Sequence, residues 1–212
     1  MLPPTQARCV IVGGGVVGAS VAYHLTRRGW RDVVLLERRR LTSGTTWHAA
    51  GLIAQLRATA NLTRLARYSQ ELYGALEAET GVATGFRRVG SITAALTGER
   101  MEELRRSAAM ARAFGVEIEE VAPAEIGARY PHLNLDGVVG GVFLPKDGQG
   151  DPSGITLALA RGARMGGATI LENVRATGFR MGRAGRIAAV RWEAGGEAGE
   201  TACEAVVNCA GM

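Results

Sequence analysis

A glycine-rich turn near the start of the chain constrains its fold most. The apolar run Cys9–Val12 leads into Gly13–Gly18, which reads GGGVVG, and an apolar stretch follows. A strand, a tight turn and a helix in this order fit the pattern G-x-G-x-x-G: Gly13 permits the turn, Gly15 lets the backbone approach a phosphate, and Gly18 lets the helix pack on the strand. The segment therefore predicts a helix start whose N–H groups bind the diphosphate of a dinucleotide.

An acid follows this unit at the spacing that a dinucleotide site needs. The apolar run Val33–Leu36 ends at Glu37, about 20 residues after Gly18, where a carboxylate accepts hydrogen bonds from a ribose hydroxyl. Arg38–Arg40 come next and could contact a 2′-phosphate, but the Glu37 carboxylate would repel it. The pattern thus favours NAD or FAD. The alternative is that the glycines form a structural turn and that Glu37 is a solvated acid. This alternative does not explain why the segment contains three glycines, each of which loses much backbone entropy on folding.

Composition narrows the class of protein. With 212 residues, 47% of them hydrophobic, the chain can form one large domain or two small ones. It has neither an apolar run of membrane-spanning length nor a signal peptide, so we expect a cytoplasmic protein without a membrane partner. The three cysteines, Cys9, Cys203 and Cys209, form no metal or disulfide framework, and we expect no metal. The net charge of +5 comes from scattered arginines, which argues against a nucleic-acid partner.

Changes in residue pattern suggest three segments along the chain. Residues 1–84 form the first part of a nucleotide-binding domain, residues 85–147 a partial substrate domain of mixed α and β structure, and residues 148–212 the second, incomplete part of the nucleotide-binding domain. Within them we expect helices over 61–79, 98–115, 122–130 and 152–164, and strands over 86–96 (two, around Gly90), 116–121, 137–144, 168–171, 174–181, 186–192 and 202–208. The sequence stops just after the last strand, so we expect a fragment of a longer protein.

Four segments carry a resemblance to a known family. They are Val33–Glu37 (VVLLE), Leu41–Gly51 (LTSGTTWHAAG), Asp147–Pro152 (DGQGDP) and Val207–Gly211 (VNCAG). Over nearly the whole chain the sequence resembles the dimethylglycine and sarcosine dehydrogenase branch of the FAD-dependent amine oxidoreductases. The resemblance implies an α/β fold: a Rossmann-like FAD-binding domain of the glutathione-reductase/D-amino-acid-oxidase type, with an inserted mixed α+β portion of a substrate domain, truncated at the C-terminus.

The resemblance also implies a set of cofactor contacts. In that family the histidine of the W-H-A-A-G segment carries FAD covalently through the flavin 8α carbon, and His48 occupies this place. Non-covalent FAD at the same site stays an alternative, and by itself a histidine beside a tryptophan is more often a packing or capping residue. Besides Gly13, Gly15 and Gly18, the expected contacts are Val16, Val17, Glu37, Arg38, Gly44, Thr45, Thr46, Trp47, His48, Ala49, Ala50, Gly51, Leu52 and Ala176.

The implied activity is oxidative demethylation of an N-methylated glycine such as dimethylglycine or sarcosine. The substrate would be a small amine that gives a hydride from its N-methyl group to the flavin, with an electron-transfer flavoprotein or oxygen as the electron acceptor. Members of this branch often have a C-terminal folate-binding region. The alternatives are a glycine oxidase or D-amino-acid dehydrogenase with non-covalent FAD, a non-catalytic FAD-binding fragment, and an NAD-dependent dehydrogenase. The long loop through His48 argues against the last. The resemblance assigns no catalytic residue.

Overall fold

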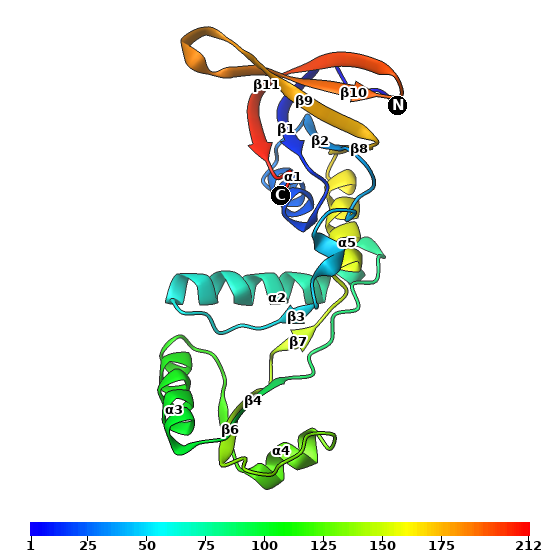
Figure 1. The fold of residues 1–212 in the computed structure, drawn as a ribbon. Helices are drawn as coiled ribbons and strands as arrows, with labels where there is room; N and C mark the ends of the chain where they lie inside the picture. Colours follow the sequence, from blue (N-terminus) through cyan, green and yellow to red (C-terminus); the bar gives the residue numbers. More distant parts are fainter. The chain divides into compact units, whose positions relative to one another are not determined.

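The computed structural model describes the backbone of residues 1–212 and the side chains of residues 1–183 and 185–212. The chain folds into two compact units, and Figure 1 labels most of their helices and strands. Unit 1 contains Met1–Gly51, Ala75–Gly85 and Asp151–Met212, and unit 2 contains Leu52–Gly74 and Phe86–Gly150. The sequence-based division stays a prediction; it agrees with the units in setting apart a middle segment, but it assigned residues 52–74 to the first part of the nucleotide-binding domain.

Unit 1 is built on a six-stranded sheet in the order β8-β2-β1-β11-β10-β9. Its elements are β1 (Gln6–Val12), α1 (Val16–Arg27), β2 (Val33–Glu37), the 3-10 helix η1 (Thr46–His48), α5 (Pro152–Met165), β8 (Thr169–Glu172), β9 (Val174–Met181), the 3-10 helix η2 (Arg183–Gly185), β10 (Ile187–Ala194) and β11 (Glu197–Asn208). Strands β8, β2, β1 and β11 run parallel, and β9, β10 and β11 are antiparallel. Every residue of β2 is buried, as expected for a strand within a parallel sheet.

Strand β11 changes partner along its length. Residues 197–202 pair with β10, and residues 202–208 pair with β1. The sequence predicted a strand that begins at Ala202. The observed strand begins at Glu197, because its first residues pair with β10. Apolar side chains of the parallel strands and of the β9–β10 ribbon share one core: Ala7, Val10, Val34, Leu36, Leu171, Val174, Val190 and Trp192. This core fixes the sheet edge at which β1, β2 and β11 end.

Helices α1 and α5 contact each other closely in unit 1. A Cβ atom at Gly162 would lie 2.7 Å from the Tyr23 ring, and one at Gly166 would lie 2.6 Å from Cβ of Thr26. Gly162 on α5 and Gly166, which caps the C-terminus of α5, thus let the two helices approach each other. Helix α5 starts as the sequence predicts, because the Asp151 carboxylate accepts a hydrogen bond from the backbone N–H of Ser153 and proline follows the cap.

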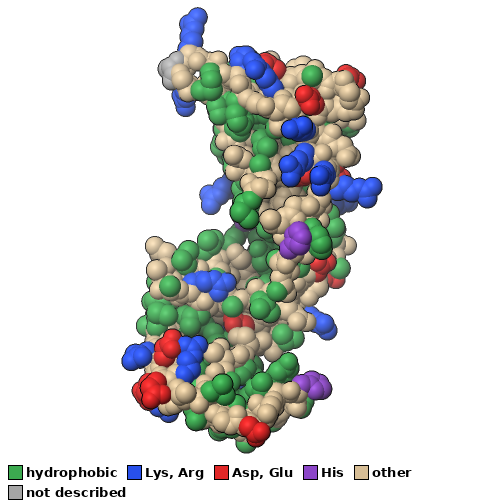
Figure 2. Space-filling model, viewed as in Figure 1, with side chains coloured by type: hydrophobic (Ala, Val, Ile, Leu, Met, Phe, Trp, Pro, Cys, Tyr) green, Lys and Arg blue, Asp and Glu red, His purple; other side chains and the backbone are tan. Residues whose placement is uncertain are grey.

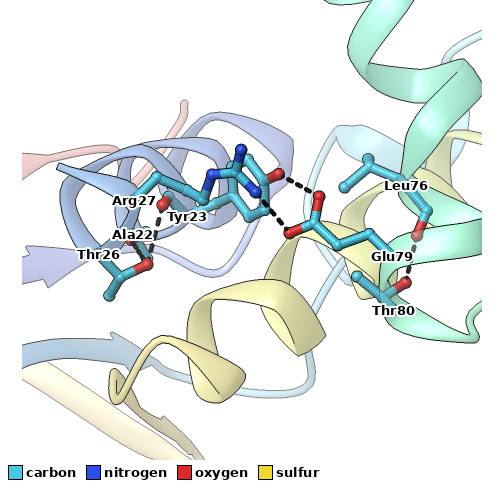
Figure 3. A network of polar contacts seen from close by, with 7 residues as sticks. All are labelled: Ala22, Tyr23, Thr26, Arg27, Leu76, Glu79 and Thr80. Carbon is cyan, nitrogen blue, oxygen red and sulfur yellow. Dashed lines mark hydrogen bonds and ion pairs between the residues drawn. The ribbon is translucent and has the colours of Figure 1, made fainter. Parts of the chain in front are cut away.

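A polar cluster joins α1 to the last turns of α2 (Ala60–Thr80), a helix whose residues 75–80 belong to unit 1. The buried Tyr23 hydroxyl donates to Oε2 of Glu79 at 2.8 Å, and Nη1 of Arg27 donates to Oε1 of the same carboxylate at 3.0 Å (Figure 3). The Thr80 hydroxyl donates to the carbonyl of Leu76. Both carboxylate oxygens of Glu79 therefore have partners, and α1 is held against this end of α2.

Unit 2 contains a three-stranded antiparallel sheet in the order β4-β6-β5 and a short β3-β7 pair. Its elements besides α2 are β3 (Leu52–Ile53), β4 (Ser91–Ala95), α3 (Gly98–Ala113), β5 (Glu119–Val121), α4 (Pro123–Arg129), β6 (Gly140–Leu144) and β7 (Gly148–Gln149). Its core joins α3 to the sheet: Leu56, Ala95, Met101, Leu104, Ala108, Ala111, Val116, Ile118, Val142 and Leu144. The buried Asp147 carboxylate accepts hydrogen bonds from the Gln55 N–H and the Ser91 hydroxyl.

The helices predicted from the sequence are confirmed to within a few residues, whereas three strands are shorter than expected, among them the one expected over 137–144, which begins at Gly140. The strand expected over 116–121 begins only at Glu119, because Val116 and Ile118 pack into the core beside α3 as irregular chain. The first of the two strands expected around Gly90 is reduced to one bridge between Arg87 and Gln149. Gly90 has a φ of +76°, and a Cβ there would lie 2.2 Å from the Phe143 ring, so the chain turns at the glycine around which two strands were expected.

Candidate cofactor-binding site

The glycine turn lies at the ends of β1 and β11 and leaves no room for side chains at two of its positions. Gly13 has a φ of +109°, and a Cβ there would lie 2.2 Å from the Cys209 carbonyl oxygen. A Cβ at Gly18 would lie 2.0 Å from the carbonyl oxygen of Gly13, so the first turn of α1 rests directly on the turn before it. At the start of α1, the N–H groups of Val17 and Gly18 have no acceptor within the helix.

The Glu37 carboxylate is held by two backbone donors. The Gly14 N–H donates to Oε2 at 2.7 Å, and the Arg39 N–H donates to Oε1 at 2.8 Å. The residue is only 9% exposed. Each carboxylate oxygen can accept more than one hydrogen bond, so both keep an acceptor position for the hydroxyls of a ribose. Gly14, which the sequence pattern treats as variable, is therefore part of the site: a Cβ there would lie 2.8 Å from Cβ of Glu37.

The loop 41–48 packs on the glycine turn through two hydrogen bonds. The Thr42 N–H donates to the Gly14 carbonyl at 3.0 Å, and the Val16 N–H donates to the Thr46 hydroxyl oxygen at 3.0 Å. Gly15 precedes α1 and supplies no side-chain cap, so the buried Thr46, 30 residues later, caps the helix in its place. These hydrogen bonds place the loop beside the start of α1.

A cavity of about 280 Å³ lies between the glycine turn, the loop and the end of β11. It is lined by Gly13, Gly14, Gly15, Glu37, Arg38, Arg39, Ser43, Gly44, Thr45, Thr46, His48, Cys209, Ala210, Gly211 and Met212. A second hollow of about 230 Å³ shares Gly13, Glu37, Arg38 and Ala210 with the first and adds Val12, Leu36, Val174, Arg175 and Ala176. The two hollows meet at Glu37, as the diphosphate and adenosine ends of one nucleotide would.

The structure brings eight of the seventeen predicted residues to the lining of this cavity, and Ala176 to the second hollow. Val16, Val17 and Gly18 start the helix beside the cavity, whereas Trp47, Ala49, Ala50 and Gly51 do not line it. Leu52 belongs to unit 2 and is 79% exposed. The lining residues that were not among the predicted contacts are Val12, Gly14, Leu36, Arg39, Ser43, Val174, Arg175, Cys209, Ala210, Gly211 and Met212. Residues 209–212 could have been placed at the site from the sequence. They follow a predicted strand of the parallel sheet, and the carboxyl ends of parallel strands lie at one edge of the sheet.

Two nucleophilic side chains line the same cavity, His48 and Cys209. The His48 imidazole is exposed and stacks on the Trp47 indole. Burial raises the pKa of the Cys209 thiol, so this group stays protonated, and weakly nucleophilic, at neutral pH. Of the two, His48 is the better nucleophile toward a ligand in the cavity.

The glycine turn, the free N–H groups and the held acid fit the diphosphate and ribose of FAD, and comparison with known proteins identifies the family. The family of FAD-dependent oxidoreductases (DAO) matches residues 8–212. The chain belongs to this family. The predicted fold class is confirmed: L-proline dehydrogenase from P. horikoshii matches with a TM-score of 0.89 and 28% identity, over 98% of this chain and 53% of that one.

Curated relatives of this FAD-dependent oxidoreductase include amine dehydrogenases. Mitochondrial sarcosine dehydrogenase from Mus musculus is 41% identical over 99% of the chain, and mitochondrial dimethylglycine dehydrogenase from Rattus norvegicus is 39% identical over 98%. The mitochondrial pyruvate dehydrogenase phosphatase regulatory subunit of Mus musculus is 36% identical over 99%. The chain spans about a quarter of the length of these relatives, namely 23%, 24% and 23%. The predicted resemblance is thus confirmed at the level of the family and its sarcosine and dimethylglycine dehydrogenase relatives.

Figure 2 shows basic side chains at several separate places, with acidic side chains among them, on the face drawn. Among the described residues, no group of three or more His, Cys, Asp or Glu side chains is arranged to hold a metal ion. None of the described helices combines the length and apolar character that crossing a bilayer requires. The cytoplasmic location stays a prediction.

Gly14→Ala is expected to weaken FAD binding about 10-fold, although the motif allows any residue there. The added Cβ would push Glu37 away and disturb a hydrogen bond to a charged group, which contributes roughly 1.5–3 kcal/mol. Titration of the apoprotein with FAD, followed by quenching of flavin fluorescence, measures the change. Gly178→Ala is the matched control, since nothing lies within 4 Å of a Cβ at that position. Equal affinities for both variants would contradict the role of Gly14.

Proposed function

We propose that this chain forms the FAD-binding part of an enzyme that oxidatively demethylates an N-methylated glycine, sarcosine or dimethylglycine. The observation that carries the proposal is the cradle formed by Gly13–Gly18 and Glu37, with His48 lining the same cavity. The chain also shares about 40% of its residues with sarcosine and dimethylglycine dehydrogenases. A nucleotide cradle alone fits many oxidoreductases; the cavity-lining histidine within W-H-A-A-G favours this branch.

Each part of the cradle has a task toward FAD. The N–H groups of Val17 and Gly18 would donate to the diphosphate, and the positive end of α1 faces the same charge. The Thr46 hydroxyl accepts from Val16 and so keeps its own proton free to donate to a phosphate oxygen. Glu37 would accept hydrogen bonds from the ribose hydroxyls, next to the hollow that Ala176 lines.

His48 would bind the cofactor covalently. An imidazole nitrogen of His48 would form a bond to the flavin 8α carbon in place of one of its C–H bonds. The two hydrogens displaced, from the C–H and the imidazole N–H, would leave with two electrons on dioxygen as hydrogen peroxide, so that atoms and electrons balance. The link would fix the flavin to the loop that Thr46 anchors on α1.

When bound, FAD supplies the redox chemistry by accepting a hydride from the N-methyl group of the substrate. Water then hydrolyses the oxidised amine to formaldehyde and the demethylated amine. The residues described above would hold the cofactor through its diphosphate and its ribose. An electron-transfer flavoprotein or oxygen is the proposed electron acceptor.

Anaerobic mixing of the FAD-loaded protein with candidate amines tests the proposed activity. Sarcosine or dimethylglycine is expected to bleach the visible flavin absorption and release one formaldehyde per flavin reduced. Glycine, which lacks an N-methyl group, serves as the matched control and should leave the flavin oxidised. Bleaching by glycine without formaldehyde would instead support a glycine oxidase. Reoxidation by air, compared with reoxidation by an electron-transfer flavoprotein, identifies the acceptor.

A non-catalytic FAD-binding role is the second candidate. One relative of similar identity is named a regulatory subunit rather than an enzyme, which favours this alternative over any other. In that case the protein would bind FAD through the same cradle, yet none of the amines would bleach it, although dithionite would. This outcome would overturn the enzymatic proposal and leave the nucleotide site intact.

A further inference from the structure

We propose that Trp47 is a positioning residue that orients the His48 imidazole for attachment to the flavin. The inference deepens the proposed function and rests on the covalent link proposed for His48. The geometry points to Trp47 because its indole ring contacts the imidazole directly: the ring centroids lie 3.9 Å apart, with 32° between the ring planes. Stacking at this distance is an attractive contact that restricts both rings.

The backbone that carries these two side chains is itself held. Thr46, Trp47 and His48 form the 3-10 helix η1, and the Thr46 hydroxyl accepts a hydrogen bond from Val16 at the start of α1. The N–H groups of His48 and Ala49 donate to the carbonyls of Thr45 and Thr46. The η1 backbone is therefore fixed relative to the glycine turn, and the remaining freedom of His48 lies in its side-chain torsions.

Only the stack restrains those torsions within the described part of the chain. No hydrogen bond joins the His48 imidazole to another described side chain or backbone group, and the exposed ring is not wedged into the core. Histidines that act in a defined geometry are commonly oriented by a partner on the second ring nitrogen. Here the aromatic face of the neighbouring residue takes that place, and both ring nitrogens stay free.

The position of Trp47 outside the cavity separates its role from cofactor binding. His48 lines the cavity whereas Trp47 does not, and the indole is 58% exposed. A large aromatic ring that is neither buried nor lining the site adds little to the core or to the pocket wall. Its contact with His48 restricts the attacking ring to fewer orientations before the bond forms, which raises the fraction of productive encounters.

The test compares Trp47→Leu, which removes the ring, with Trp47→Phe, which keeps an aromatic face. Trp30→Leu in the same unit is the matched control. In the protein without cofactor, NMR is expected to show the His48 ring protons shifted upfield by the indole, and shifted back in Trp47→Leu. After incubation with FAD, acid-stable flavin should form about 10-fold more slowly in Trp47→Leu than in wild type, with total bound FAD unchanged. Trp47→Phe should restore most of the rate.

The outcomes distinguish this inference from the proposed function. If wild type forms acid-stable flavin and Trp47→Leu forms it at the same rate, the positioning role is wrong while the link to His48 stands. If wild type binds FAD without any acid-stable fraction, the covalent link is wrong and the positioning role falls with it. Absence of an upfield shift of the His48 ring protons in wild type would also overturn the proposal, whatever the variants do.

Discussion

Gly18→Ala is expected to reduce FAD affinity at least about 100-fold and to lower the free energy of unfolding by about 2–3 kcal/mol. The new Cβ would lie 2.0 Å from the Gly13 carbonyl oxygen, and a backbone atom cannot yield as a side-chain tip can. Overpacking of this kind typically costs 1–3 kcal/mol. Moving α1 off the turn would also misplace the Val17 and Gly18 donors, and two hydrogen bonds to a charged diphosphate together contribute about 3 kcal/mol or more.

Thermal unfolding of the apoprotein and titration with FAD separate the two parts of this prediction. Gly98→Ala is the matched control: it is also a helical glycine, at the first position of α3, and nothing lies within 4 Å of its Cβ position. The control should keep the affinity and the stability of wild type. If Gly18→Ala bound FAD as tightly as this control, the direct contact between α1 and the glycine turn would not shape the site.

The sequence was enough to predict the elements that follow one periodic pattern. The β1–α1–β2 unit, with its glycine turn and its buried β2, was predictable because apolar runs, glycines and the acid lie next to one another along the chain. The pairing of β11 with two different strands was not predictable, since the same apolar pattern fits pairing with β10 and pairing with β1. The assignment of residues 52–74 to unit 2 likewise depends on long-range packing, including the contact of Gln55 with Asp147.

The candidate site shows the same division between local and long-range information. Glu37 and the three motif glycines follow from spacing, and His48 from the resemblance. Gly14 was missed because the motif describes only the positions where a phosphate requires glycine. At Gly14 a side chain is excluded by the Glu37 side chain packed against it. The Thr46 cap on α1 joins residues 30 positions apart, and no local pattern in either segment predicts such a bond.

His48→Ala is expected to abolish acid-stable flavin while FAD still binds reversibly. The cradle for the diphosphate and ribose consists of backbone N–H groups and Glu37, none of which the substitution removes. After incubation with FAD, denaturation in acid should leave wild-type protein yellow and release all flavin from the variant. His132→Ala is the matched control, because this histidine lies in unit 2, in the turn after Pro131, and should leave the covalent flavin unchanged.

Cys209 is the rival nucleophile that this experiment must exclude, since it lines the same cavity. Its raised pKa predicts little thiolate at neutral pH, so a link through sulfur would form faster as the pH rises toward that pKa. We expect Cys209→Ser to keep its acid-stable flavin. The proposal is contradicted if acid-stable flavin survives in His48→Ala, disappears in Cys209→Ser and forms faster at alkaline pH. The bond would then lie on Cys209, directly after β11, and Trp47 would not orient the attacking group.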